Sequence, residues 1–324
     1  MNMIYRKLGK WGLQVSALSI GNHIDWAKTI PDEETEAIIT RAYEGGVNYI
    51  DTAEKYANGK QQPLVGSIIR KKGWPRNSLV LGTKVTPSGI AGAPPNARGL
   101  GRKHVIEVCE QALRDYDTDH LDLLFCHRPD PNVSPQEVVR TMNLLIQQGK
   151  ILHWGTSDHS PELLLEMHAY AESEGMEGPA MEQTWYNMIG RARVENDLLP
   201  LLRNYGMGVT AYQPFAGGML TGKYLDGIPE DSRYAQNEHH QNFITEERLE
   251  VVRGFKQIAD ELGCPMPVFA LAWALKNPDV STLIAGASKL SQVETNLQAI
   301  DLLPQLNDEV MSRVADIQAG RLQI

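Results

Sequence analysis

The amino-acid sequence predicts an α/β fold: a single (β/α)8 barrel, or TIM barrel, with a short N-terminal β-hairpin and extra C-terminal helices. Two observations lead to this prediction. Eight short apolar segments alternate with eight amphipathic segments of helical length. No half of the chain holds strands alone, which favours a closed parallel barrel over an open doubly wound sheet. Because no linker or low-complexity tract interrupts the alternation, residues 1–324 are expected to form one domain.

The elements are expected where the spacing of apolar residues changes from that of a strand to that of a helix. The hairpin is expected over residues 5–18, ahead of the first barrel strand. The strand–helix pairs, in chain order, are 15–21 and 33–44, 47–51 and 61–72, 78–84 and 102–116, 120–127 and 134–149, 151–157 and 160–175, 179–187 and 194–206, 208–214 and 245–263, and 280–288 and 290–300.

Two helix starts carry a clear capping signal. Ser134 and Ser160 each precede a proline, and Glu137 follows Ser134 by three positions. A capping serine before a first-turn proline predicts that a helix begins at the next residue. An additional helix is expected over residues 267–277, just before the last strand.

Composition excludes several classes of function. The net charge is −9 and no block of basic residues occurs, so we expect no nucleic-acid partner. No apolar run approaches the roughly 18 residues of a membrane span, and the first ten residues lack a signal core. We therefore expect no membrane insertion and a cytoplasmic location. The three cysteines are far apart and form no CxxC pair, which argues against a disulfide framework or a zinc site.

Three motifs that would indicate a nucleotide or metal site are incomplete, in the wrong context or absent. Residues 217–224 nearly match a phosphate-binding P-loop, but Tyr224 stands where the magnesium-binding hydroxyl belongs. Residues 206–211 match GxGxxA but precede a strand instead of opening a helix, so a Rossmann site is not expected. There is no HExxH, and we expect no metal site.

Polar side chains at the ends of three neighbouring strands predict a catalytic site. Asp51, Lys84 and His127 end the second, third and fourth strands, and Tyr56 follows Asp51 in the same loop. In a parallel barrel these loops meet at one end. The set suits proton transfer to a carbonyl oxygen. Lys84 would lower the tyrosine pKa from its reference value of about 10, Asp51 would hold Lys84, and His127 would orient the carbonyl.

Each of these residues also has an ordinary structural explanation. Asp51 could cap a loop, Tyr56 could pack on the surface, Lys84 could form a structural ion pair, and His127 could be a hydrogen-bonded core histidine. The placement of all four at consecutive strand ends is what favours the catalytic interpretation.

The segment DTAEKY, residues 51–56, resembles a signature of the aldo-keto reductase family, and the resemblance extends from YRKLGK to SQVETNL. The segments IIRKKGW, HRPDPN, WGTS, LTGKY and GIPEDSR are similar to the branch of voltage-gated potassium channel β subunits and their bacterial relatives. The resemblance implies a catalytic tetrad of Asp51, Tyr56, Lys84 and His127. It also implies NADPH-dependent reduction of a small aldehyde or ketone, with Tyr56 as the acid.

The resemblance further implies a nicotinamide cofactor bound without a Rossmann fold. Ser157 and Gln183 would hold the carboxamide, Tyr212 would stack on the ring, and Lys223 and Arg233 would contact the 2′-phosphate of NADPH. Backbone groups after Tyr212 would approach the pyrophosphate. The remaining cofactor residues implied are Asp158, Gln213, Pro214, Phe215, Ala216, Gly217, Gly286, Ser288, Gln292 and Asn296, the last three from one helix face.

Three positions depart from the family pattern. Asp158 stands where many members have asparagine, which puts the second carboxamide contact in doubt. Thr295 stands where a glutamate usually meets the adenine amine, and His23 replaces a common aromatic near the substrate. His127 is retained, whereas channel subunits of this branch tend to carry asparagine there, and this favours an active reductase.

Two other interpretations stay open at this point. The resemblance also allows an NADPH-binding, redox-sensing regulatory subunit with slow turnover that docks on a membrane partner. A barrel using another phosphorylated ligand would bind no nicotinamide at all. The resemblance suggests a homo-oligomer, a tetramer or a larger ring. The substrate is not readable, because it depends on the variable loops 22–32, 86–102, 185–192 and 228–245.

Overall fold

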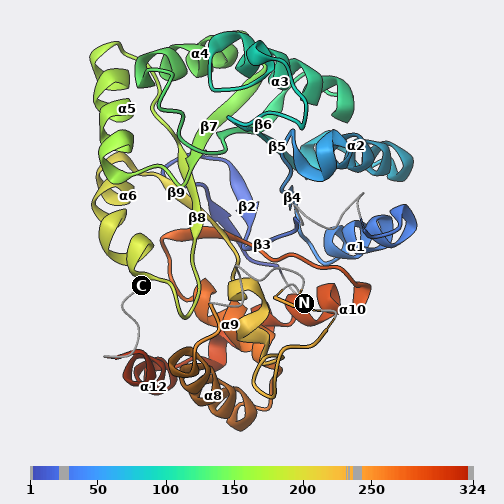
Figure 1. The fold of residues 1–324 in the computed structure, drawn as a ribbon, viewed down its shortest axis with the longest axis vertical. Helices are drawn as coiled ribbons and strands as arrows, with labels where there is room; N and C mark the ends of the chain where they lie inside the picture. Colours follow the sequence, from blue (N-terminus) through green and yellow to red (C-terminus); the bar gives the residue numbers. More distant parts are fainter. Residues whose placement is uncertain (1–2, 22–28, 231, 233, 236–242, 320–324) are drawn as a thin grey trace.

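Eight parallel strands form one sheet that curves into a nearly closed barrel (Figure 1). The computed structural model describes residues 3–21, 29–230, 232, 234–235 and 243–319. The strands lie side by side in the order β3, β10, β9, β8, β7, β6, β5, β4. Ile20 N–H donates to Tyr49 O at 3.2 Å and Asp51 N–H donates to Ile20 O at 2.8 Å, which joins the two edges. The barrel strands are β3 Leu18–Ser19, β4 Tyr49–Ile50, β5 Val80–Val85, β6 Leu121–Cys126, β7 Ile151–Ser157, β8 Met181–Trp185, β9 Gly208–Tyr212 and β10 Val280–Ile284.

The helices surround the sheet (Figure 1). Both predicted caps are confirmed: the Ser134 side chain accepts from Glu137 N–H, and the Ser160 side chain accepts from Leu163 N–H. The α-helices are α1 Asp32–Glu44, α2 Gln61–Lys72, α3 Arg102–Tyr116, α4 Pro135–Gln147, α5 Pro161–Ser173, α6 Leu199–Tyr205, α8 Glu246–Glu261, α9 Met266–Leu275, α10 Leu290–Leu297, α11 Ala299–Leu302 and α12 Asp308–Gln318. Short 3-10 turns are η1 Tyr56–Gly59, η2 Arg76–Ser78, η3 Pro95–Ala97, η5 Ala216–Thr221 and η6 Leu303–Gln305, and η4 Arg193–Asp197 is a π-helical turn.

The N-terminal hairpin closes one end of the barrel. It consists of β1 Tyr5–Lys7 and β2 Gln14–Ser16, paired antiparallel as the sequence predicted. Leu8 and Val15 are fully buried and pack in one cluster with Val80 and Met181, the first residues of β5 and β8. Access to the barrel interior is therefore left to the opposite end, where the strands terminate.

Several predicted boundaries were wrong. The first barrel strand was expected over 15–21, but residues up to Ser16 pair with the hairpin and only Leu18–Ser19 join the barrel. The physical reason is that Ala17 N–H still bonds Ile4 O, at 2.8 Å. The helix expected over 194–206 is divided between η4 and α6, and α12 had been assigned no range of its own.

Within the described ranges, no single helix is long and apolar enough to cross a membrane. The consecutive pair α8 and α9 meets the length and composition criterion only when joined, across a bend of 95°. Every residue of α9 except Pro267 is buried in the core. Nor do the side chains in these ranges include a cluster of three or more His, Cys, Asp or Glu that could hold a metal ion.

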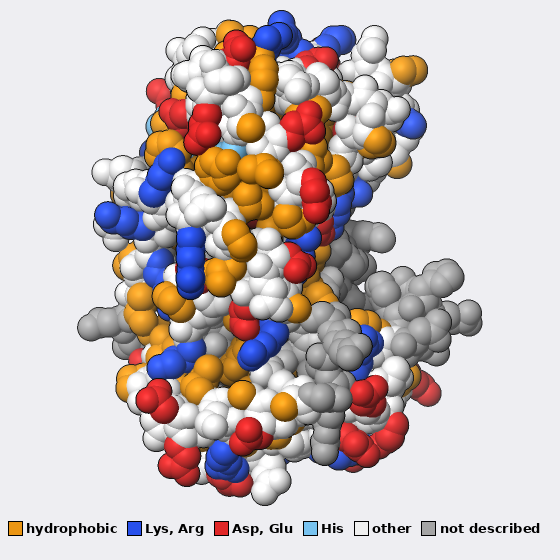
Figure 2. Space-filling view, turned by 90° about the vertical axis from the view of Figure 1, so that its left-hand side faces the viewer, with side chains coloured by type: hydrophobic (Ala, Val, Ile, Leu, Met, Phe, Trp, Pro, Cys, Tyr) orange, Lys and Arg blue, Asp and Glu red, His pale blue; other side chains and the backbone are white. Residues whose placement is uncertain are grey.

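The side of the molecule on which α5, α6 and α12 lie carries hydrophobic side chains between charged ones (Figure 2). Leu165 on α5 is 50% exposed. Basic side chains on this face are interspersed with acidic ones instead of gathering in one patch (Figure 2). The homo-oligomer suggested by the sequence stays a prediction.

Candidate active site

Polar side chains gather at the C-terminal ends of consecutive barrel strands. Successive side chains of a strand point to opposite faces, so residues two positions apart point the same way. In and after β6, Leu123 and Phe125 pack in the barrel interior, so His127 points the same way one step later. The other strand-end residues are Asp51 after β4, Lys84 in β5, Ser157 ending β7, Gln183 in β8 and Tyr212 ending β9.

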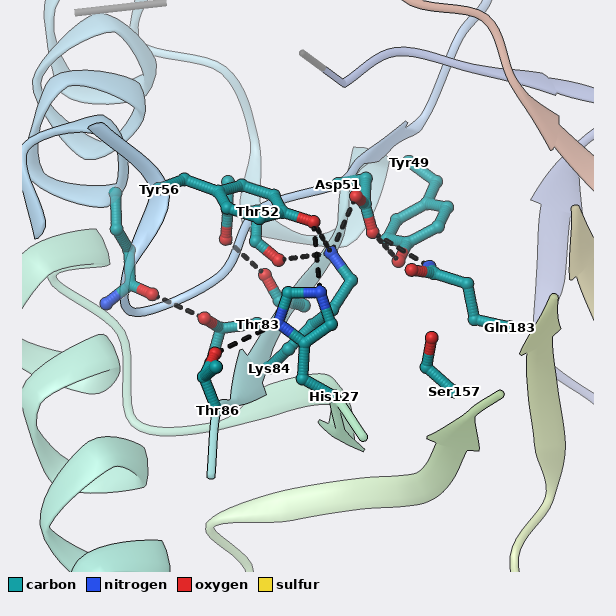
Figure 3. A network of polar contacts seen from close by, with 12 residues as sticks. Tyr49, Asp51, Thr52, Tyr56, Thr83, Lys84, Thr86, His127, Ser157 and Gln183 are labelled. Carbon is teal, nitrogen blue, oxygen red and sulfur yellow. Dashed lines mark hydrogen bonds and ion pairs between the residues drawn. The ribbon is translucent and has the colours of Figure 1, made fainter. Parts of the chain in front are cut away.

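A buried ion pair lies at the centre of this end of the barrel (Figure 3). Lys84 is 0% exposed, and its Nζ lies 2.6 Å from Asp51 Oδ2. The same Nζ donates to Thr52 O at 2.7 Å and to Tyr56 Oη at 3.1 Å. All three ammonium hydrogens are therefore used. Asp51 Oδ1 accepts from Tyr49 Oη at 2.9 Å, so the carboxylate is held from both sides.

The Tyr56 hydroxyl lies between a cation and an imidazole (Figure 3). Its Oη is 3.5 Å from His127 Nε2, in addition to its bond from Lys84. The Lys84 ammonium is 4.6 Å from the centre of the Tyr56 ring. Tyr56 and His127 are each 8% exposed. The structure thus brings together the four residues that the sequence singled out, although their catalytic roles stay a prediction.

One expectation about this tyrosine was wrong. The sequence suggested that Lys84 would lower the pKa of Tyr56, but burial raises that pKa well above its usual value, and the charge of Asp51 acts in the same direction. Burial also lowers the pKa of Lys84, against the effect of Asp51. The sequence did not reveal that Tyr56 and Lys84 would be buried. The consequence is that the phenol keeps its proton at neutral pH, which is the state an acid must start from.

The two residues expected to hold a carboxamide lie apart from Tyr56, on the far side of the network (Figure 3). Gln183 Nε2 donates to Asp51 Oδ1 at 3.0 Å, and no residue in the described ranges bonds its Oε1. Ser157 Oγ accepts from Arg128 Nη1 at 2.8 Å. An amide oxygen and a hydroxyl there suit an amide ligand, which both donates and accepts.

Arg128 is a site residue that sequence reasoning missed. Its Nη2 lies 3.1 Å from Asp158 Oδ2, which also accepts from Tyr212 Oη at 2.6 Å. Asp158 sits at φ 52°, a backbone conformation that non-glycine residues seldom adopt. Its carboxylate is thus committed to Arg128 and Tyr212, which strengthens the doubt about Asp158 as a carboxamide contact. The one indication in the sequence was that a cationic residue, Arg128, directly follows His127.

The loop after Tyr212 has a backbone conformation that lets a ligand come close to its N–H groups. Gln213, Ala216 and Gly217 have φ values of 53°, 48° and 68°. A Cβ at Gly217 would lie 2.3 Å from the Tyr234 hydroxyl, so only glycine fits there. Turns that combine right-handed and left-handed residues direct successive backbone N–H groups toward one side and form anion-binding concavities. Pro214 and Phe215 complete this stretch.

Of the two cations expected at a 2′-phosphate, Lys223 is exposed and Arg233 lies outside the described residues, as does His23. In the part of the chain that is described, no carboxylate pairs with Lys223, and its Nζ lies 5.0 Å from the centre of the Tyr224 ring. Within the described ranges, the Lys223 ammonium is therefore available to an anion.

The residues expected around an adenosine lie in α10 and just before it. Gly286 and Ser288 precede this helix. The prediction that one helix face presents Ser288, Gln292 and Asn296 is therefore wrong for Ser288. Gln292 Oε1 accepts from Ser288 N–H at 2.7 Å, which commits that oxygen to the helix start. Asn296 is 6% exposed, and its Nδ2 has no hydrogen-bond partner in the described protein. Thr295 Oγ1 bonds Ser291 O at 2.9 Å, inside the helix.

A buried carboxyl group fixes the loop that carries Ser157. Glu182 in β8 is 0% exposed, and its Oε1 accepts from His159 N–H at 3.0 Å. Its other oxygen accepts from the Thr156 hydroxyl, and Arg193 Nη2 lies 3.4 Å from Oε1. Burial raises the pKa of Glu182 to about 8, against the hydrogen bond from Thr156 and the charge of Arg193.

Glu182→Gln is expected to make stability less dependent on pH. Between the reference pKa of 4.5 and about 8, the folded protein keeps a proton on Glu182 that the unfolded chain releases. The free energy of unfolding therefore falls as pH rises through this window, by up to about 1.4 kcal/mol per pH unit. Glutamine carries no such proton. Denaturant unfolding of both proteins across this range measures the difference, and parallel stability curves would contradict it.

Comparison with known proteins places this geometry in a family. The profile of the Aldo/keto reductase family matches residues 17–319. A probable voltage-gated potassium channel subunit beta of Arabidopsis thaliana is 40% identical over 320 residues, which cover 97% of this chain and 96% of that protein. A protein with the same description from Oryza sativa subsp. japonica is 39% identical, over 96% of this chain and 95% of its own. A putative voltage-gated potassium channel subunit beta of Schizosaccharomyces pombe is also 39% identical, with 98% and 93% covered.

Proposed function

Because the chain belongs to the aldo/keto reductase family, we propose that it reduces an aldehyde or ketone to an alcohol with NADPH. Family membership implies oxidoreductase activity, and the proposal adds the cofactor, the reaction and the residues. The observation that carries it is the Tyr56 hydroxyl, which receives a hydrogen bond from the buried Lys84 ammonium and lies 3.5 Å from His127 Nε2. An O–H group so placed can give its proton to an oxygen that lies against both residues.

In the proposed reaction, NADPH held by the cofactor residues would supply a hydride to the carbonyl carbon. Tyr56 gives its proton to the carbonyl oxygen, so the product is an alcohol and the tyrosine is left as a phenolate. Lys84 stabilises this phenolate through its hydrogen bond to Oη, and Asp51 keeps Lys84 charged. His127 holds the oxygen in place with Nε2.

Three features of the chain fit a nicotinamide dinucleotide. The Oε1 of Gln183, which no described residue bonds, can accept from a carboxamide, and Ser157 lies beside it. The turn that contains Gln213, Ala216 and Gly217 can offer backbone N–H groups to a pyrophosphate. The buried Nδ2 of Asn296, which has no partner among the described residues, can donate to adenine, because a buried amide group usually has a partner.

The direct test mixes the protein with NADPH and then with a panel of aldehydes and ketones, following nicotinamide absorbance and tryptophan fluorescence. Fluorescence quenching followed by steady oxidation of NADPH is the expected result. Absence of NADPH binding would show that the cofactor residues are misassigned and would favour a different ligand.

Lys223→Ala is expected to lower affinity for NADPH by about 10-fold to 100-fold, the loss of one charge-assisted hydrogen bond. Affinity for NADH should hardly change, since NADH has no 2′-phosphate. Fluorescence titration with both nucleotides measures the two constants. Lys276→Ala is the matched control, because it removes the same charge from an exposed lysine at the end of α9. An equal loss for both nucleotides would contradict a contact to the 2′-phosphate.

The names of the relatives favour one second candidate. Each is described as a voltage-gated potassium channel subunit beta, so this chain could instead be an NADPH-binding regulatory subunit with slow turnover. Co-expression with a tagged potassium channel α subunit, followed by purification from detergent-solubilised membranes, tests this. A stoichiometric complex together with a single slow turnover of NADPH would favour the subunit, and steady turnover by free protein would favour the reductase.

A further inference from the structure

A threonine outside the four-residue network contacts the catalytic histidine directly. Thr86 follows the last residue of β5 and is 3% exposed. Its Oγ1 lies 2.9 Å from His127 Nδ1, on the side of the ring away from Tyr56 (Figure 3). Each ring nitrogen of His127 thus faces a different hydroxyl, Nδ1 that of Thr86 and Nε2 that of Tyr56.

The direction of this hydrogen bond follows from counting hydrogens. A threonine hydroxyl has one hydrogen, and Thr86 Oγ1 contacts no hydrogen-bonding group in the described protein other than His127 Nδ1. Because the side chain is buried, the hydrogen has to go to Nδ1, or a buried donor is left unsatisfied. Nδ1 is then the acceptor. In a neutral imidazole the other nitrogen carries the hydrogen, so Nε2–H faces Tyr56 and the space where a carbonyl oxygen would lie.

Thr86 is itself held by a second buried pair. Its backbone N–H donates to Glu54 Oε1, and Glu54 Oε2 lies 3.0 Å from His104 Nε2. His104 Nδ1 is 2.7 Å from Gly99 O, which can only accept. With a carboxylate at the other nitrogen, both ring nitrogens of His104 donate and the ring is charged. Burial lowers the pKa of His104, but the bonds to Glu54 and Gly99 outweigh it and the net shift is upward.

This pair connects three parts of the site. Glu54 belongs to the loop that carries Asp51 and Tyr56, and His104 lies in the first turn of α3. The contacts therefore tie the position of Thr86, and through it the His127 ring, to the loop that presents the acid.

We propose that Thr86 is a positioning residue that fixes His127 in the Nε2–H tautomer, so that His127 donates a hydrogen bond to the substrate carbonyl oxygen, while Glu54 and His104 hold Thr86 in place. The kinetic consequence rests on the proposed reductase function. The tautomer itself does not, because it is a property of the protein alone.

The first test reads the tautomer without any turnover. Protein labelled with 15N at the histidine ring nitrogens should show His127 with a protonated Nε2 and an unprotonated Nδ1, and His127→Gln assigns these signals. In Thr86→Val, which keeps the shape and removes the hydroxyl, the signals should move toward a mixture of both tautomers. Thr86→Ser should restore the original pattern. An Nδ1–H signal in the unmodified protein, or an unchanged pattern in Thr86→Val, would overturn the proposal.

The second test reads the consequence for catalysis. Thr86→Val is expected to lower kcat/KM for aldehyde reduction by about 10-fold, the effect of one hydrogen bond of ordinary strength, with NADPH affinity unchanged. Thr86→Ser should recover most of the loss. The matched control is Thr83→Val in β5, because the Thr83 hydroxyl is also buried but bonds Gln62 Oε1, at 2.5 Å. An equal loss in Thr83→Val would mean that Thr86 acts only through packing or stability.

The two tests separate this proposal from the function on which it rests. If the unmodified protein turns over no carbonyl compound, the reductase proposal fails, and the nitrogen signals still decide the tautomer. If Thr86→Val does not fold, the unmodified protein and Thr86→Ser still have to show Nε2–H on His127, and Nδ1–H in either would refute the assignment.

Discussion

Tyr56→Phe is expected to lower kcat for carbonyl reduction by about 10²-fold to 10⁴-fold, the contribution of one general acid. The substitution removes the only O–H group that the four-residue network offers to a substrate oxygen and leaves the ring in place. Burial keeps the phenol protonated at neutral pH, so the unmodified protein starts each turnover with the acid ready. Affinity for NADPH should be almost unchanged, because Ser157 and Gln183, which are proposed to hold its carboxamide, lie on the other side of the network.

Steady-state kinetics with the best substrate of the panel, together with a fluorescence titration of NADPH, measure both quantities. Tyr116→Phe is the matched control. Tyr116 is 3% exposed and its hydroxyl bonds Thr52 Oγ1 at 2.6 Å, so its removal also deletes a buried phenol hydroxyl near the site, but one that does not face it. Tyr116→Phe should therefore lose stability and keep kcat. Turnover by Tyr56→Phe at the unmodified rate would show that another group supplies the proton.

The positions of the catalytic candidates could be predicted from the sequence because a polar residue at the end of an apolar run is easy to recognise. Lys84 and His127 end apolar runs where packing alone would not place a charge or an imidazole. In a parallel barrel all such ends meet. The alternation of eight strands with helices could also be recognised in the sequence, and the observed eight-stranded sheet confirms it.

Features that depend on contacts between distant segments could not be predicted in this way. The link from Arg128 to Asp158 and Tyr212 joins the ends of three strands, and its geometry depends on how they are aligned. The raised pKa of Tyr56 depends on burial, which its loop sequence does not reveal. The role of Gln292 in capping α10 required the exact start of that helix, which is set by the turn at Ser288.

Lys84→Met is expected to abolish most turnover and also to destabilise the protein by about 3–5 kcal/mol, the typical cost of removing one partner of a buried ion pair. Asp51 is 4% exposed, and two of its contacts, from Tyr49 and Gln183, both go to Oδ1. Among the described residues, Lys84 is the only cation within ion-pair distance of Asp51, so without it the charge on Oδ2 is left unpaired. In the proposed reaction, Tyr56 would also lose the cation that stabilises its phenolate after proton transfer.

The double variant Asp51→Asn/Lys84→Met separates these two effects. It removes the unpaired charge, so most of the lost stability should return, because replacing both members of a buried pair costs far less than breaking it. Activity should not return, because the phenolate still lacks its cation. Denaturant unfolding of the two single variants and the double variant gives the coupling energy. A Lys84→Met protein as stable as the double variant would show that Asp51 is not left uncompensated, whereas recovery of turnover in the double variant would show that Lys84 serves the fold and not the chemistry.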